Sequence, residues 1–143
     1  MPNTYLIAAG RLLLSIIFIM SGIGKFADPA STAGMIAQAG LPAASLLTYL
    51  AAIFETAAGL AVLFGFQTRV ASLLLAAFCV FTGFVFHGGA INIPDFPEGA
   101  NAMLSMFNQL MMMKNVTIAG GFLVLASTGA GALSLDARLK AFA

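Results

Sequence analysis

The sequence predicts an all-α membrane protein, a bundle of four transmembrane helices with a short interfacial helix between the first and the second. Hydrophobic residues make up 61% of the chain of 143 residues, and charged residues only 8%. A hydrocarbon core of about 30 Å requires roughly 20 mostly apolar residues per helix, and four such runs fit into the sequence. These runs are apolar throughout, whereas transmembrane β-strands alternate apolar and polar residues.

The four spans are expected within one domain that occupies residues 1–143, at about residues 5–25, 45–66, 69–88 and 103–129. The first span is not expected to be a cleaved signal peptide, because it carries Arg11 inside the apolar run and no basic segment precedes it.

The connections between the spans have their own signals. After the first span, residues 31–39 predict a short helix, with Asp28 as N-cap, Pro29 in the first turn and Gly40 at the end. Residues 67–69 form a tight connection, so the second and third spans should be antiparallel neighbours.

The distribution of Lys and Arg predicts the orientation. With four crossings, Arg69, Arg138 and Lys140 lie on the side of the termini, and Lys25 and Lys114 on the other side. Because cytoplasmic loops carry an excess of Lys and Arg, we expect both termini to be cytoplasmic.

Composition also limits the function. The net charge is +1, so no basic surface indicates nucleic acid as a partner. Cys79 is the only cysteine, which excludes an intrachain disulfide and a Cys-x-x-Cys redox pair. His87 is the only histidine, so no metal site and no intrachain bis-His haem is predicted. The sequence contains no catalytic motif, which leaves enzymatic activity open and predicts no intrinsic cofactor.

Two charged residues fall deep inside apolar runs. Arg11 belongs to a stripe of the first span that also contains Ser15, Gly22 and Lys25, and Glu55 lies on a small-residue face of the second span. Counting about 1.5 Å per residue places Arg11 roughly 21 Å from Lys25 and Glu55 roughly 15 Å from Ser45, a difference that the length of the two side chains can close. The sequence therefore predicts an intramembrane Arg11–Glu55 ion pair, with a structural role favoured over a proton relay through Glu55.

A second polar cluster is expected at the opposite ends of the helices. These side chains should meet in one vestibule at the ends of the helices, where they supply two cations, an imidazole and several amides. Such a site suits a carbonyl-bearing or anionic ligand, such as a quinone, with His87 and a lysine as hydrogen-bond donors. The competing interpretation is that the lysines extend to the membrane interface without a ligand. The candidate ligand-binding residues are Lys25, His87, Asn108, Gln109, Lys114 and Asn115.

Several segments resemble the DoxX family of small four-helix inner-membrane proteins, over nearly the whole chain. They include GRLLLSIIFIMSGIGKF at 10–26, AGLP at 39–42, Phe54-Glu55 with Gly59, GFQTR at 65–69 and KNVTIAGG at 114–121. The resemblance implies a multi-pass protein of the bacterial inner membrane. Some members are linked to membrane redox systems, as a subunit of thiosulfate:quinone oxidoreductase or beside a thiol transferase and superoxide dismutase.

The sequence and the resemblance together lead to one leading hypothesis and two alternatives. The leading hypothesis is a redox-associated or accessory subunit that binds a quinone or a lipid in the vestibule. The first alternative is a purely structural subunit of a larger membrane complex, such as a respiratory or dehydrogenase complex. The second is a small-solute permease, which with only four helices would require a homo-oligomer. In each case the lipid bilayer is a partner.

Overall fold

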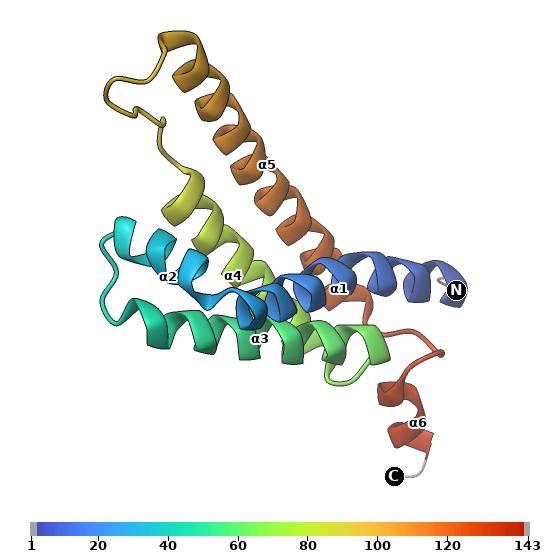
Figure 1. Cartoon of the computed structure of the whole chain (residues 1–143). Coiled ribbons are helices and arrows are strands. Elements are labelled where there is room, and N and C mark those ends of the chain that lie inside the picture. Colours follow the sequence, from blue (N-terminus) through green and yellow to red (C-terminus); the bar gives the residue numbers. More distant parts are fainter. Residues whose placement is uncertain (1–2, 142–143) are drawn as a thin grey trace.

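The computed structural model describes residues 3–141 and confirms the predicted all-α bundle (Figure 1). Within residues 3–141, four helices are long and apolar enough to cross a membrane: α1 (Thr4–Ala27), α3 (Ala44–Phe64), α4 (Thr68–His87) and α5 (Glu98–Thr128). The same described part of the chain contains two shorter helices, α2 (Pro29–Gln38) and α6 (Leu135–Ala141). The described N- and C-terminal segments lie at the same end of the bundle (Figure 1).

Helix α5 begins earlier than the sequence predicts, at Glu98 rather than near residue 103. It therefore has 31 residues. At 1.5 Å per residue such a helix is about 46 Å long, well beyond a hydrocarbon core of about 30 Å.

The short helix α2 starts and ends at the expected signals. The Oδ1 atom of Asp28 accepts a hydrogen bond from the backbone N–H of Ser31 at 3.2 Å, and Pro29 occupies the first turn. The chain leaves the helix at Gly40, whose φ of +74° is accessible to glycine without strain. These contacts turn the chain back toward α3.

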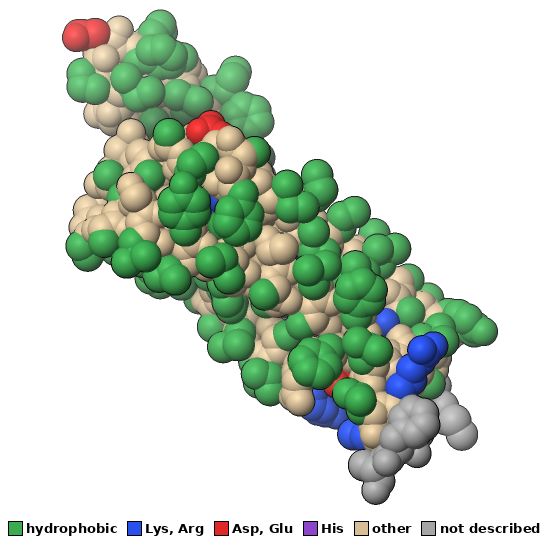
Figure 2. Space-filling view, turned by 60° about the horizontal axis from the view of Figure 1, so that its bottom comes forward, with side chains coloured by type: hydrophobic (Ala, Val, Ile, Leu, Met, Phe, Trp, Pro, Cys, Tyr) green, Lys and Arg blue, Asp and Glu red, His purple; other side chains and the backbone are tan. Residues whose placement is uncertain are grey.

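The spanning helices pack as two antiparallel pairs, α1 with α3 and α4 with α5, and the pairs are inclined to each other (Figure 1). Their shared core contains Val62 of α3, Leu75 of α4 and Phe122 of α5, all fully buried. Large apolar side chains cover the outer surface, while Lys and Arg gather near the described C-terminal end (Figure 2). This surface is the one expected of a bundle surrounded by lipid.

The α1–α3 pair depends on a close approach at Gly22. A methyl group there would come within 2.8 Å of the Ala52 carbonyl oxygen, and closer still to the Thr56 hydroxyl. Small residues at such contacts let two transmembrane backbones approach each other.

Gly22→Ala is therefore expected to lower the free energy of unfolding by about 2 kcal/mol, because the pair cannot close without a backbone shift. The matched control is Gly24→Ala, since a methyl group at Gly24 meets nothing within 4 Å. This control should be neutral or slightly stabilising. SDS titration of the purified protein in mixed micelles measures both values, and equal losses in the two variants would contradict the assigned contact.

Candidate ligand-binding cavity

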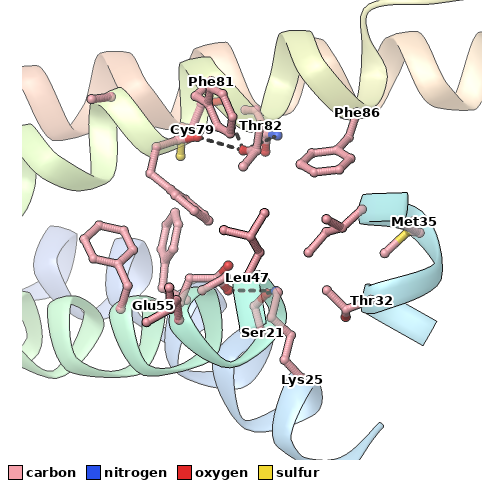
Figure 3. A pocket seen from close by; sticks show the side chains of 18 of the residues that line it. Ser21, Lys25, Thr32, Met35, Leu47, Glu55, Cys79, Phe81, Thr82 and Phe86 are labelled. Atoms are coloured by element: carbon pink, nitrogen blue, oxygen red, sulfur yellow. Dashed lines mark hydrogen bonds and ion pairs between the residues drawn. The ribbon is translucent and has the colours of Figure 1, made fainter. Parts of the chain in front are cut away.

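A cavity of about 830 Å³ lies between the two helix pairs, and α2 closes one side of it (Figure 3). Most of its wall is apolar, with Phe54 of α3 and Phe78 of α4 in contact at a ring-centroid distance of 5.1 Å. The polar residues that line it come from all five helices of this region: Ser21, Lys25, Thr32, Glu55, Cys79, Thr82, His87, Lys114 and Asn115. An apolar cavity with a few polar groups is typical of small-molecule binding sites.

The Lys25–Glu55 ion pair forms the polar floor of the cavity. The Nζ atom of Lys25 lies 3.0 Å from Oε2 of Glu55 and donates a second hydrogen bond to Oγ of Ser21 at 2.8 Å. The Glu55 side chain is 3% exposed and that of Lys25 is 18% exposed. Figure 3 shows the three side chains together, opposite Thr82 and Phe86 of α4.

The prediction of an Arg11–Glu55 ion pair is wrong, because Glu55 forms its ion pair with Lys25. The reason is the register of α1 on α3. Gly22 lies against Ala52 and Thr56, which places Lys25 about two helical turns deeper along α3 than Ser45. Arg11 consequently lies beside Gly65, at the far end of α3.

Arg11 instead donates hydrogen bonds to the chain segment that follows α5. Its Nη1 donates to the carbonyl oxygen of Ala130 and its Nη2 to that of Leu133, both at 2.6 Å. The guanidinium is almost fully buried, and Gly65, with a φ of +69°, leaves room for it where a side chain would collide.

Asp136 fastens the same segment to the start of α4. Its two carboxylate oxygens accept the backbone N–H groups of Gln67 and Thr68 at 2.7 and 3.0 Å. Partial burial would raise the pKa of Asp136, but these backbone hydrogen bonds outweigh it and hold the pKa below its usual value. We call residues 130–136, with these two contacts, the C-terminal latch.

The predicted vestibule residues are brought together in part. Lys25, His87, Lys114 and Asn115 all line the cavity. Asn108 lies behind His87, with its Oδ1 atom 2.7 Å from Nδ1 of the imidazole. Gln109 is exposed and does not line the cavity, because it faces away from α4 on α5.

Sequence reasoning missed several residues of the cavity. Ser21 precedes Lys25 by one helical turn, so its contact with the ammonium could have been inferred from the spacing. Thr82 lies on α4 opposite Asn115, whose Nδ2 approaches its hydroxyl at 3.5 Å. No sequence signal placed Thr32 of α2 in the wall, because that depends on how α2 folds back over the bundle.

The fold and the cavity define an α-helical integral membrane protein with an amphipathic internal cavity. The DoxX family model matches residues 6–88, more than half of the chain. The chain is also 41% identical to the inner membrane protein YqjF of Escherichia coli, over 94% of this chain and 92% of YqjF. The chain therefore belongs to the DoxX family.

Two further relatives support this membership. The inner membrane protein YphA of Escherichia coli is 32% identical over 93% of this chain and 89% of its own length. The uncharacterized membrane protein Rv3486 of Mycobacterium tuberculosis is 31% identical over 91% of this chain and 78% of its own length. No solved structure matches the chain.

Proposed function

We propose that this protein is a redox-associated accessory subunit of the bacterial inner membrane that binds a quinone or a similar lipid in the cavity. The observation that supports this proposal most directly is that Lys25, His87 and Lys114 line the same apolar cavity. Ammonium groups donate hydrogen bonds to ligand oxygens, and the aromatic and aliphatic wall accommodates a ring and an apolar tail.

The location and the orientation are part of this proposal. Two relatives bear the name inner membrane protein, and the helices of this chain have the required length. Arg69 lies at the start of α4, and Arg138 and Lys140 lie in α6, at the end of the bundle that holds the described terminal segments (Figure 1), which favours a cytoplasmic position for that end.

Membranes containing the native protein are expected to yield a co-purifying quinone, and Lys114→Ala and His87→Ala should reduce its amount several-fold. The matched control is Gln109→Ala, since Gln109 lies on the same helix as Lys114 but outside the cavity. Quinone extraction followed by chromatography measures the content per protein. An unchanged content in both cavity variants would exclude the proposed ligand.

Redox association requires a partner protein that carries the redox group and exchanges electrons with the bound quinone. Purification in a mild detergent should recover a dehydrogenase or respiratory subunit in a fixed ratio. A partner without bound quinone would instead support the purely structural subunit, and a homo-oligomer that transports solutes in liposomes would support the permease.

A further inference from the structure

The imidazole of His87 is held by an amide whose orientation is itself fixed. Asn108 donates from Nδ2 to the carbonyl oxygen of Gly89 at 2.8 Å, and its Oδ1 lies 2.7 Å from Nδ1 of His87. A carbonyl oxygen only accepts, so the amide nitrogen must face Gly89 and the amide oxygen must face the imidazole. The hydrogen between Oδ1 and Nδ1 must therefore be carried by Nδ1.

This arrangement determines what His87 offers to the cavity. In a neutral imidazole with the hydrogen on Nδ1, the other ring nitrogen, Nε2, is a hydrogen-bond acceptor. Within residues 3–141, Nε2 has no hydrogen-bond partner, and it is not among the enclosed unpaired atoms. His87 lines the cavity and its Nδ1 faces Asn108, which does not line it, so Nε2 is the ring nitrogen left for a ligand.

The other charged groups of the cavity complement this acceptor. The ammonium groups of Lys25 and Lys114 only donate, and Oε2 of Glu55 is engaged by Lys25. A ligand that satisfies both kinds of group must donate one hydrogen bond and accept another.

We infer that His87, positioned by Asn108, makes the cavity selective for the hydroxyl-bearing, reduced form of its ligand, a quinol rather than a quinone. A quinone carries two carbonyl oxygens and no donor, so it would leave Nε2 unpaired in an apolar wall. A quinol hydroxyl donates to Nε2 while the oxygens of the quinol can accept from a lysine. The inference concerns binding alone and rests on the proposed function, because it presumes a quinone-type ligand.

The tautomer can be tested without any ligand, because the chain has a single histidine. The full-length protein with ¹⁵N-labelled histidine, in detergent at pH 8, should show the hydrogen on Nδ1 and an unprotonated Nε2. Asn108→Leu should lose this preference. Ser105→Ala is the control, since Ser105 tethers the same loop through Ile91 and does not touch His87. A hydrogen on Nε2 in the native protein would overturn the inference.

The selectivity is tested by titrating the detergent-solubilised protein, without oxygen, with a short-chain ubiquinol and with the corresponding ubiquinone. The native protein should bind the quinol about five- to tenfold more tightly, the value of one hydrogen bond. In Asn108→Leu and His87→Phe this ratio should fall toward one, while Ser105→Ala should retain it. Equal binding of both forms by the native protein refutes the inference alone. Binding of neither form refutes the proposed function, and the inference with it.

Discussion

Lys25→Met is expected to lower the free energy of unfolding by about 3 kcal/mol at pH 7. The substitution leaves the Glu55 carboxylate without its cationic partner while its side chain is only 3% exposed. The same SDS titration measures this loss. Glu55→Leu should cost less, because Lys25 is more exposed and keeps its hydrogen bond to Ser21.

A double-mutant cycle separates the pair from the individual side chains. The double variant Lys25→Met/Glu55→Leu should recover much of the loss, because neither charge remains buried without its partner. A loss in the double variant equal to the sum of the two single losses would mean that Lys25 and Glu55 do not interact. Recovered stability combined with lost quinone binding would assign the pair to the ligand site.

Arg11→Ala should lower the free energy of unfolding by about 3 kcal/mol, because the carbonyl oxygens of Ala130 and Leu133 both lose a charged donor. Removal of the charge relieves part of its desolvation, since Nε of Arg11 is buried without a partner. The two lost hydrogen bonds outweigh this gain.

The control for Arg11 is Arg69→Ala. Arg69 is exposed and donates one hydrogen bond to a backbone carbonyl, that of Ala126 at 2.9 Å. Its removal should cost less than about 1 kcal/mol. The variants are compared by SDS titration, and limited proteolysis should cut residues 129–135 faster in Arg11→Ala alone. If residues 129–135 of Arg11→Ala resist the protease as well as those of the native protein, Arg11 does not hold this segment in place.

Much of the fold follows from local signals that the sequence displays. The four apolar runs are long enough to identify the spans, and the Asp28-Pro29 pair predicts the start of α2 because capping is decided within a few residues. The start of α5 at Glu98 was not predicted, because Glu98, Gly99 and Asn101 interrupt the apolar pattern and resemble a loop.

The candidate site was predicted less completely, because it depends on tertiary register. Arg11, Lys25 and Glu55 were all recognised as unusual charges, but their pairing is decided by the seating of Gly22 on α3. Similarly, Asn108 and Gln109 are neighbours in sequence, yet they point about 100° apart on the helix. Only the packing of α4 on α5 determines that Asn108 meets His87.

The C-terminal latch and the cavity lie at opposite ends of the seam between the two helix pairs. The latch connects α1, the start of α4 and the segment after α5, so it holds the two helix pairs together at that end. At the other end the two pairs diverge around the cavity, and α2 covers one side of it (Figures 1 and 3). Because the walls of the cavity are helices of the membrane-spanning bundle, its proposed hydrophobic ligand would reside at the depth of the lipid tails rather than in water.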